Sequence, residues 1–351
     1  YISLKNRLGR VPYLLDFYEN GEIDPLVIIR EYKTYQNFLE SVEKEAYTGR
    51  ITSEELVTLE YLSKTILSGT RPYELEILKR LLHTKDVDFE KFSRAFNYEY
   101  GFEVDFKSFD NAVEVLQGKF VSKDEEYQKY CHIDIVSNNE QRMLRRLEGF
   151  ERRIWHAEFY KQVNDIVQVG LGRFAEKYRY GAIDDSPFVL YEKYSRRDVS
   201  LLMNCGKDLS STMYGMKRIG DDAFIFVTYH KEESSDDKEY VDGKPDYADA
   251  FEDNMIFKWD SQMGRGVDSS YVADVVEAKR KHLLVKKSDA ETNFYYVGQF
   301  DVVDVKPAKK KDNAGKERDI AKFRMKMHQA VRDDLLRYFQ SNVVTKKERV
   351  G

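Results

Sequence analysis

Two carboxylates and a lysine, Asp301, Asp304 and Lys306, come nearest to a catalytic pattern in this sequence. A metal-dependent nuclease needs clustered carboxylates with a lysine on a strand hairpin, and this spacing allows one. Acids and bases also commonly alternate along a charged strand that faces water. We therefore favour a structural interpretation of these three residues and keep a nuclease within this segment as a weaker hypothesis.

Other catalytic signatures are absent from the sequence. There is no Gly-x-x-x-x-Gly-Lys phosphate loop, no His-Glu-x-x-His helix and no Cys-x-x-Cys pair, and the six histidines are scattered singly. Cys131 and Cys205 lie far apart and indicate neither a disulfide framework nor a metal site. Gly170-Leu171-Gly172 lies inside a helical pattern instead of after a strand, so it is a poor dinucleotide fingerprint. We expect no catalytic residue, metal or cofactor in this segment, and whether it is an enzyme stays open.

The charge is distributed unevenly along the 351 residues, although the net charge is only −5. Residues 221–260 hold 13 acidic and 4 basic side chains, whereas residues 261–351 hold 13 acidic and 20 basic ones. Such a contrast can put a cationic face on phosphate and an acidic face on solvent or a partner. No apolar run approaches the roughly 20 residues that a membrane span needs, and no secretory leader is present, so we expect a cytoplasmic protein without a membrane partner.

The first half of the chain has the pattern of an all-helical region. Apolar residues recur at spacings of three and four, and Gly or Pro separates the intervals. Thr52-Ser53-Glu54-Glu55 is a capping-box pattern, and it begins a helix with Leu56, Leu59 and Leu62 on one face. Further helices are expected after Arg71-Pro72 and at Phe89 to Phe96, Phe109 to Leu116, Glu140 to Leu147 and Glu158 to Tyr178.

From about Gly181 the composition changes to short runs rich in Phe, Tyr and Val, which are typical of strands. In the last of these runs, apolar residues alternate with Lys322, Arg324 and Lys326, which predicts a half-buried strand with a basic outer face. Strands are expected at Phe224 to Tyr229, His282 to Lys286, Phe294 to Phe300 and Ile320 to Met327.

Two polar segments separate the expected strands. Lys309 to Gly315 has the composition of a turn, and Glu232 to Asp253 that of a long acidic loop. Short strands joined in this way suggest a compact, strongly curved sheet or barrel. The sequence therefore predicts an α+β protein, with an all-α helical domain at 1–180 and a second domain at 181–351 that is a strongly curved sheet or a barrel.

One order of segments carries a resemblance to a known family. It runs from Tyr194-Ser195-Arg196-Arg197-Asp198 through Ser210-Ser211-Thr212-Met213-Tyr214-Gly215 to Phe257-Lys258-Trp259-Asp260-Ser261-Gln262, and it continues in Phe294-Tyr295-Tyr296-Val297-Gly298. This order resembles the C-terminal region of the SauUSI-like type IV restriction enzymes, which attack DNA that carries modified cytosine. Family members are bacterial DEAD/DEAH-type helicase proteins, often with an N-terminal phospholipase-D-type nuclease. The resemblance covers nearly all of the chain.

The resemblance implies a helical coupler that follows the helicase motor, and after it an SRA- or PUA-like β-barrel. Such a barrel reads 5-methyl- or 5-hydroxymethylcytosine by capturing a base that has flipped out of the duplex, in a system of antiphage defence. The implied partners are modified double-stranded DNA and the upstream helicase and nuclease domains of the same chain, with a second copy of the chain as a further candidate. ATP and Mg²⁺ would act only in the upstream helicase. The start at Tyr1 instead of Met fits a segment from within a longer protein.

A flipped cytosine needs rings to stack on and polar groups that read its Watson–Crick edge. Carboxylates accept from the cytosine amino group, while Arg and Gln contact bases or phosphates. On the implied function, the candidates for DNA and base contact are Tyr194, Arg196, Arg197, Asp198, Tyr214, Tyr229, Trp259, Ser261 and Gln262. The candidates for phosphate contact are Lys217, Arg218, Lys310, Lys311, Lys322, Arg324 and Lys326.

Each candidate also has a structural interpretation. Aromatic rings in a β-rich domain are most often part of a core. Asp198 equally fits the first turn of a helix, Ser261-Gln262 equally fits a turn before Gly264, and the lysines at 309–311 equally fit a solvated hairpin tip. The alternative function is a protein-interaction or dimerisation scaffold that regulates the helicase without reading bases, and the negative net charge favours it.

Overall fold

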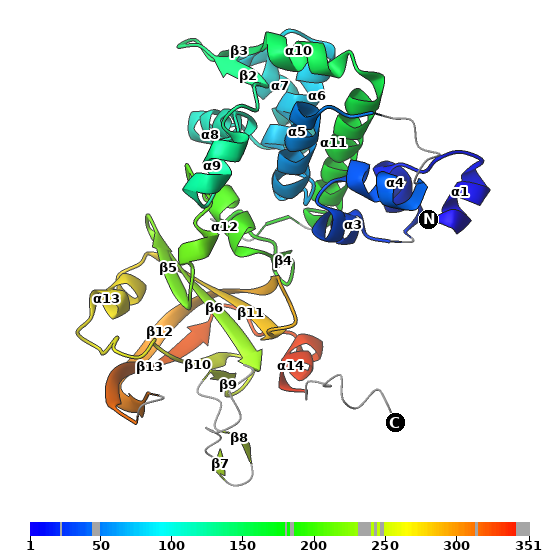
Figure 1. Cartoon of the computed structure of the whole chain (residues 1–351). Helices are drawn as coiled ribbons and strands as arrows, with labels where there is room; N and C mark the ends of the chain where they lie inside the picture. The colour runs from blue at the N-terminus through cyan, green and yellow to red at the C-terminus, as the bar shows by residue number, and fades with distance from the viewer. Residues whose placement is uncertain are drawn as a thin grey trace. The chain divides into compact units, whose positions relative to one another are not determined.

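The computed structural model divides the chain into two compact units (Figure 1). The first unit consists of Tyr1–Tyr180 with Ser200–Leu209, and the second of Gly181–Val199 with Ser210–Gly351. No helix in the part of the chain that the structure describes has the length and apolar character needed to cross a bilayer. The structure describes residues 1–21, 23–43, 50–179, 181–182, 186–230, 240–241, 244–245, 249–312 and 315–341, so most of the acidic loop expected at 232–253 lies outside the described residues.

The first unit is built mainly from helices, several of which begin at a side-chain cap. The Thr52 hydroxyl accepts a hydrogen bond from the Glu55 backbone at 3.2 Å, and the Glu55 carboxylate accepts one from the Thr52 backbone at 2.8 Å. The predicted capping box is therefore confirmed. The helices are α1 Ile2–Leu8, α2 Leu14–Asn20, α3 Pro25–Tyr32, α4 Tyr35–Glu43, α5 Ser53–Thr65, α6 Tyr73–His83, α7 Phe89–Tyr100, α8 Phe106–Leu116, α9 Asp124–Tyr130, α10 Glu148–Ile154 and α11 Ala157–Lys177.

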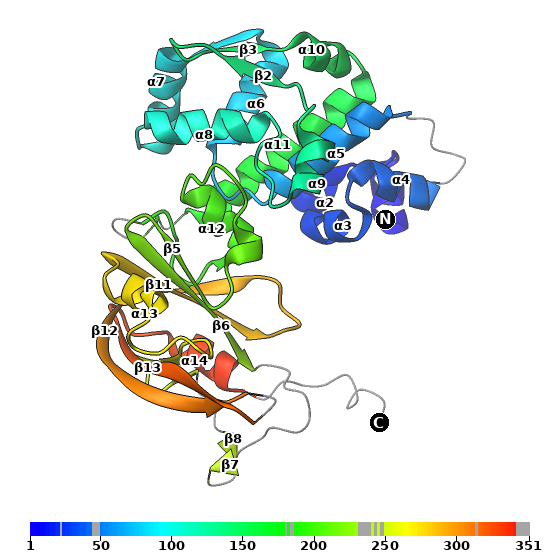
Figure 2. The ribbon, with the colours of Figure 1, turned by 60° about the vertical axis from the view of Figure 1, so that its left-hand side comes forward.

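Helix α11 lies at the centre of this unit and packs against α2, α5 and α6 (Figure 2). Its apolar residues Phe159, Val163 and Val167 are fully buried. Each such side chain contributes about 1.5 to 3 kcal/mol through the area removed from water. The 3.6-residue spacing of apolar residues predicted this helix from Glu158 to Tyr178. The same apolar residues form the face of α11 that packs in the core.

Gly69 lies where the segment between α5 and α6 meets α11. It has a φ of 62°, and a Cβ atom on it would lie 2.3 Å from the carbonyl oxygen of Gly170. We expect Gly69→Ala to lower the free energy of unfolding of this unit by about 2 kcal/mol, because both the left-handed backbone and the close approach penalise a side chain. Urea unfolding followed by far-UV circular dichroism measures the change. Gly101→Ala is the matched control, since Gly101 has a φ of 76° but open space around its Cβ position, and equal losses in both variants would contradict the argument.

A three-stranded antiparallel sheet interrupts the helices of the first unit, so the prediction of an all-α region is wrong. Its strands are β1 Asp86–Asp88, β2 Val136–Asn138 and β3 Met143–Arg146, in the order β1-β3-β2. The helix expected at Glu140 to Leu147 is a turn followed by β3. Leu144 is the buried residue of β3, and it pairs with Val87 on one side and Asn138 on the other. Pairing on both edges outweighs the helix propensity of the Glu, Gln and Arg residues around it.

The second unit is built on an eight-stranded sheet. Seven strands follow the path β5-β6-β11-β12-β13-β10-β9, and β4 pairs with β12. Strands β6 and β11 run parallel, and the other named pairs along this path are antiparallel. Among the described residues no pairing joins β5 to β9, so the sheet is strongly curved but not closed as the expected barrel would be (Figure 2). The mixed α+β class, with helices first and a sheet second, is confirmed.

The four predicted strands are confirmed and extend beyond the predicted ranges. The lysines at 309–311 lie within β12, opposite residues 317–319 of β13, so the turn begins only at Asp312. The elements of this unit are β4 Lys193–Tyr194, α12 Arg196–Leu202, a 3₁₀ turn at Ser210–Thr212, β5 Met216–Ile219, β6 Asp222–His230, β7 Tyr240–Val241, β8 Lys244–Pro245, β9 Ala250–Phe251, β10 Ile256–Asp260, α13 Ser270–Val276, β11 Arg280–Ser288, β12 Phe294–Lys311, β13 Glu317–Met327 and α14 Asp333–Gln340. The end of α12 belongs to the first unit.

Apolar residues are buried on both faces of the central strands. On one face Ile225 and Val227 of β6 join a core that also contains Val275 of α13 and Phe339 of α14. On the other face Phe224 packs on His282 of β11 and on Phe188 in the segment before β4. A strand with both faces covered reads as a continuous apolar run, which is why β6 was recognisable from composition.

Candidate nucleic-acid interface

Arg196, at the start of α12, lies against three aromatic rings. Its Cζ atom is 5.1 Å from the ring centroid of Phe294, 5.4 Å from that of Tyr214 and 5.6 Å from that of Phe226. Burial lowers the pKa of Arg196, because desolvation penalises the charged form. A guanidinium still carries its charge at neutral pH, so the rings hold a partly desolvated cation, an arrangement worth about 0.5 to 2 kcal/mol.

Tyr214 is 61% exposed and belongs to the turn that leads into β5. Its carbonyl oxygen accepts hydrogen bonds from the Gln262 side-chain amide at 2.8 Å and from the Met216 backbone at 2.9 Å. The next residue, Gly215, has a φ of 72°, and a Cβ atom there would lie 3.0 Å from the Tyr271 hydroxyl and 3.2 Å from the amide nitrogen of Gln262. The ring, the amide and the hydroxyl can gather here because residue 215 has no side chain.

Ser261 fixes the turn that presents Gln262. Its hydroxyl donates to the Arg265 carbonyl at 2.6 Å and accepts from the Ala321 backbone at 2.8 Å. The Arg265 backbone donates to the Gln262 carbonyl at 3.0 Å, and Gly264 has a φ of 80°, as the third residue of a type II turn requires. The expected turn chemistry of Ser261-Gln262 is thus present, and it directs the Gln262 side chain toward Tyr214.

Tyr271, in the first turn of α13, completes the cluster. Its ring stacks on Trp259 with centroids 6.2 Å apart, and the Arg265 guanidinium lies 5.7 Å from its centroid. The Tyr271 hydroxyl is buried and has no hydrogen-bond partner among the described residues. Burial raises the pKa of Tyr271, so the hydroxyl keeps its proton at neutral pH. A buried hydroxyl without a partner is costly, and an incoming acceptor would remove that cost.

The structure therefore brings together three of the predicted residues, Arg196, Tyr214 and Gln262, from three separate segments. Sequence reasoning missed Arg265 and Tyr271, which lie close to them. Arg265 stands between two glycines in a turn, and that position was a signal of an exposed cation held on a fixed loop. We name the five residues Arg196, Tyr214, Gln262, Arg265 and Tyr271 the ring cluster.

Three predicted rings lie in the cores instead. Tyr194 is fully buried, and its hydroxyl accepts from the Val189 backbone at 2.9 Å. Tyr229 is 6% exposed, and its ring centroid lies 6.4 Å from that of Phe251 and 6.0 Å from that of Phe339. Trp259 is 2% exposed, and its ring contacts the ring of Tyr271 in the ring cluster. In this structure these three rings serve packing.

Asp198 stabilises the start of α12. Its carboxylate accepts from the Ser195 backbone at 2.8 Å and from the Ser195 hydroxyl at 2.7 Å, and that hydroxyl accepts from the Asp198 backbone at 3.1 Å. These reciprocal bonds are those of a capping box. The capping box holds the two residues between them at the start of the helix, with Arg196 at the first position and Arg197, half-buried, after it.

The predicted phosphate contacts fall on three places. Lys217 and Arg218 lie on β5, where Arg218 donates to the Asp274 carbonyl at 3.3 Å. Lys322, Arg324 and Lys326 form the exposed face of β13, while the residues between them are buried. Arg324 is paired with Glu252 at 3.2 Å, whereas Lys322 and Lys326 have no ion-pair partner in the described part of the chain. Lys310 and Lys311 are exposed at the end of β12.

The apolar face opposite the main core of this unit contains a polar network that the sequence did not reveal. His282, 1% exposed, is bonded through Nε2 to Asp222 at 2.8 Å and through Nδ1 to the Tyr296 hydroxyl at 2.9 Å. Arg280 donates to both carboxylate oxygens of Asp222, at 2.7 and 2.6 Å. Burial lowers the pKa of His282. The hydrogen bond with Asp222 and its negative charge act in the opposite direction but are outweighed, so the imidazole is neutral. Each polar atom has a partner, which is the pattern of a structural network.

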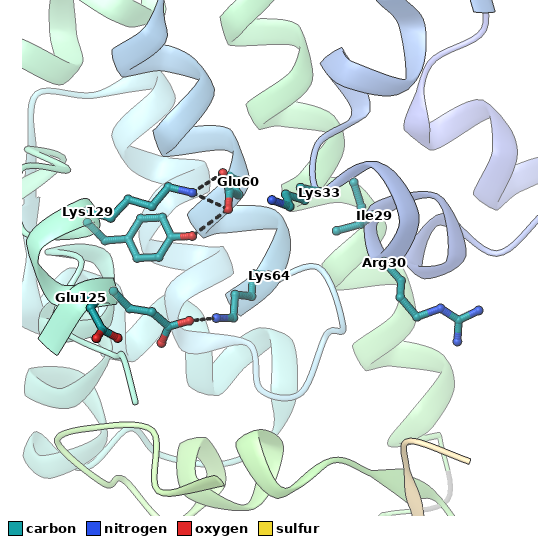
Figure 3. A pocket seen from close by; sticks show the side chains of 9 residues that line it. Ile29, Arg30, Lys33, Glu60, Lys64, Glu125 and Lys129 are labelled. Carbon is teal, nitrogen blue, oxygen red and sulfur yellow. Dashed lines mark hydrogen bonds and ion pairs between the residues drawn. The ribbon is translucent and has the colours of Figure 1, made fainter. Parts of the chain in front are cut away.

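A pocket of about 500 Å³ lies in the first unit, between α3, α5 and α9 (Figure 3). On one side Lys129 donates to Glu60 at 2.6 Å and Lys64 pairs with Glu126. Lys33, on the other side, has no carboxylate partner among the described residues. Because the cations on the first side are already neutralised, this pocket is a weaker candidate for binding an anion than the ring cluster.

The two acids that suggested a nuclease are engaged on the surface of β12. Asp304 pairs with Lys306 at 2.9 Å, and Asp301 lies 3.2 Å from His328. Within the described ranges, no group of three or more His, Cys, Asp or Glu side chains is arranged to hold a metal ion.

The first unit matches a known protein family. Residues 1–180 match the family described as Domain of unknown function (DUF8090), which is 180 of the 351 residues. The chain belongs to the DUF8090 family. In this DUF8090 protein, residues 188–339 also match Domain of unknown function (DUF3427), and the ring cluster lies within that range. No curated protein matches the chain.

Solved structures similar to this DUF8090 protein include Arabidopsis thaliana SUVH6 in complex with SAM, KRYPTONITE in complex with mCHH DNA, and the type IV phosphorothioation-dependent restriction endonuclease ScoMcrA. SUVH6 has 9% identity over 47% of this chain and 33% of its own, with a TM-score of 0.27. KRYPTONITE has 14% identity over 46% and 38%, also with a TM-score of 0.27, and ScoMcrA 9% over 84% and 68%, with 0.28. The chain thus spans well under half of the SUVH6 and KRYPTONITE chains. Identities of 9 to 14% and TM-scores of 0.27 to 0.28 do not show that these proteins share a binding site with this chain.

Proposed function

We propose that the second unit binds duplex DNA that carries a modified cytosine and captures the modified base at the ring cluster. One observation carries this proposal. Three groups converge around Gly215: an exposed ring at Tyr214, an amide at Gln262, and a buried Tyr271 hydroxyl that has no hydrogen-bond partner within the described ranges. A surface to stack on and groups that pair with the base edge are the two requirements of a site for an extruded base.

Each member of the cluster has a role in the proposal. The Tyr214 ring stacks on the base, which is worth about 1 to 3 kcal/mol. The Tyr271 hydroxyl donates to an acceptor on the base edge, and the Gln262 amide supplies both a donor and an acceptor. Arg196 and Arg265 provide positive charge beside the base, and Lys217 on the adjacent strand β5 contacts phosphate.

The proposal has a wider part, which depends on the resemblance between the order of segments in this chain and that in the SauUSI-like enzymes. In it, the helical unit couples base capture to helicase and nuclease domains of a bacterial type IV restriction enzyme, and this unit performs no chemistry. ATP and Mg²⁺ act in the helicase alone.

Binding to two duplexes that differ only in one 5-methylcytosine tests the reader. We expect Tyr214→Ala and Gln262→Ala each to weaken binding of the methylated duplex by about tenfold or more, with little effect on the unmodified duplex. Fluorescence anisotropy at moderate salt measures both affinities of the 351-residue chain. Tyr127→Ala, which removes a tyrosine 44% exposed on α9 of the other unit, is the matched control. Equal affinity of the unaltered chain for the two duplexes would overturn the proposal.

A further inference from the structure

The exposed face of β13 is the middle of a wider cationic surface. β13 lies between β10 and β12 in the sheet, and its residues Phe323 and Met325 are buried in the core of the second unit. Residues that lie directly opposite each other on neighbouring strands share one face of the sheet. The exposed cations that the strand register places on the face away from this core are Lys258, Lys306, Lys310, Arg318, Lys322, Arg324 and Lys326. We name these seven residues the cation stripe.

Within the cation stripe, cations lie directly opposite cations. Lys306 of β12 is opposite Lys322 of β13, and four residues further along the hairpin Lys310 is opposite Arg318. Side chains in such positions have Cβ atoms about 4.5 to 5.5 Å apart, so like charges there are destabilising. The two pairs therefore lower the stability of the free hairpin, and a phosphate group that lies over them offsets their repulsion.

Acidic side chains balance only part of this charge. The acid beside each of the two pairs binds one cation of that pair, because Asp304 pairs with Lys306 and Asp312 with Arg318, both at 2.9 Å. Lys310 and Lys322, the other members, form no ion pair with any residue that the structure describes. The acids that lie beside the seven cations are Asp260, Asp301 and Asp304 on the same rows of the sheet, with Glu252 and Asp312 next to them.

The length of the cation stripe suits an extended polyanion. Arg318 and Lys326 are eight residues apart on one strand, which corresponds to about 26 Å at about 3.3 Å per residue. Duplex DNA rises about 3.4 Å per base pair, so the stripe covers about eight base pairs. Among the described residues of β10, β12 and β13 no aromatic ring is exposed, whereas proteins that bind single strands stack the bases on such rings. These features favour the backbone of duplex DNA over a single strand.

We propose that the cation stripe binds the phosphate backbone of duplex DNA, whether or not the duplex carries a modified cytosine. The stripe is separate from the ring cluster, because Lys258 is exposed on the outer face while the next residue, Trp259, is buried and contacts Tyr271. Contacts to phosphate carry no sequence information, so this surface holds any duplex. The inference does not depend on base capture.

The salt dependence of binding to an unmodified duplex tests the cation stripe in the full 351-residue chain. The logarithm of the affinity falls with the logarithm of the salt concentration, with a slope of about 0.9 for each phosphate contact. Lys310→Ala and Lys322→Ala each remove a cation that has no ion pair in the described part of the chain. Each is expected to reduce the slope by about 0.9 and to weaken binding about threefold or more, equally for the unmodified and the methylated duplex. Fluorescence anisotropy between about 50 and 200 mM salt measures these changes.

Stability of the free chain gives a second measurement. Lys310→Glu places an acid opposite Arg318, so the urea midpoint of the second unit is expected to be equal to or higher than the original. The same substitution is expected to weaken binding of the unmodified duplex about tenfold or more. Fluorescence of Trp259 in a Trp155→Phe background measures the midpoint. A lower midpoint would show that Lys310 stabilises the hairpin, and it would overturn the proposal.

Lys91→Ala, which removes an exposed cation on α7 of the other unit, is the control and is expected to keep the full slope. An unchanged slope in the double variant Lys310→Ala/Lys322→Ala overturns the proposal. So does a single strand of the same sequence that binds as tightly as the duplex, or a loss that is confined to the methylated duplex. Tyr214→Ala is expected to leave the slope for the unmodified duplex unchanged, which separates failure of this inference from failure of the proposed function.

Discussion

Replacement of Arg71 by methionine is expected to lower the free energy of unfolding of the helical unit by about 3 to 5 kcal/mol. Arg71 is 3% exposed, and its guanidinium donates to the Leu201 carbonyl at 2.7 Å and to the side-chain oxygens of Asn111 at 2.7 Å and Asn204 at 2.5 Å. It also forms an ion pair with Glu74, which is 1% exposed. Methionine fills much of the same space but leaves the Glu74 carboxylate buried without a counter-ion.

Urea unfolding followed by far-UV circular dichroism measures this loss, because the helices dominate that signal. Arg145→Met is the control, since Arg145 is 63% exposed and pairs with Asp86 on the surface, where an ion pair contributes little. The double variant Arg71→Met/Glu74→Leu is expected to recover part of the loss, because an apolar pair of similar volume replaces both charges. Unfolding of the Arg71→Met chain at the original urea concentration would show that the network gives no net stabilisation.

The Arg71 network illustrates a feature that sequence reasoning could not reach. Arg71 and Glu74 were visible as neighbours at the start of a helix, but Leu201 and Asn204 lie 130 and 133 positions after Arg71 in the chain. Nothing in the local pattern of residues 200–209 indicates that this stretch belongs with the helices of the first half. Only the folded structure shows that the chain returns to the first unit after entering the second.

Local sequence patterns predicted an element correctly where interactions between residues close in sequence determine its structure. The capping box at Thr52 involves groups three residues apart, and it formed as predicted. The strand at Ile320 to Met327 alternates because one face meets the core and the other meets water, and its Lys and Arg residues are exposed as expected. Leu144 is the opposite case. Its strand is too short to show a period, and partners on two other strands decide its structure.

For the site, residue type alone could not separate rings that pack from rings that face water. Tyr194, Tyr229 and Trp259 carry aromatic rings as Tyr214 does, and of these four residues only Tyr214 is exposed. Its exposure follows from its position in a turn before a glycine, at the edge strand of the sheet. Of the two members that were missed, Tyr271 comes from helix α13, which the sequence reasoning did not assign, and Arg265 comes from the turn before it.

The second large effect concerns the buried network of the sheet unit. Asp222→Asn is expected to lower the free energy of unfolding of that unit by about 2 to 3 kcal/mol at neutral pH. The substitution removes the negative charge of the carboxylate to which Arg280 and His282 are hydrogen-bonded. Burial alone would raise the pKa of Asp222, but hydrogen bonds from His282 and Arg280 more than offset burial and hold the pKa at about 2. A carboxylate whose pKa is lowered in the folded state stabilises it above the unfolded pKa, and that contribution is lost as the pH falls.

The pH dependence makes this prediction specific. The stability difference between the unaltered chain and Asp222→Asn is expected to be largest near neutral pH and to close between about pH 4 and about pH 2, where Asp222 itself takes up a proton. Fluorescence of Trp259, 2% exposed in the core of this unit, follows unfolding in a Trp155→Phe background, because Trp155 is 81% exposed and belongs to the other unit. Asp221→Asn is the matched control, since the carboxylate of Asp221 is half exposed and pairs with Lys279 on the surface. A difference that stays constant with pH would show that Asp222 acts through shape and not through charge.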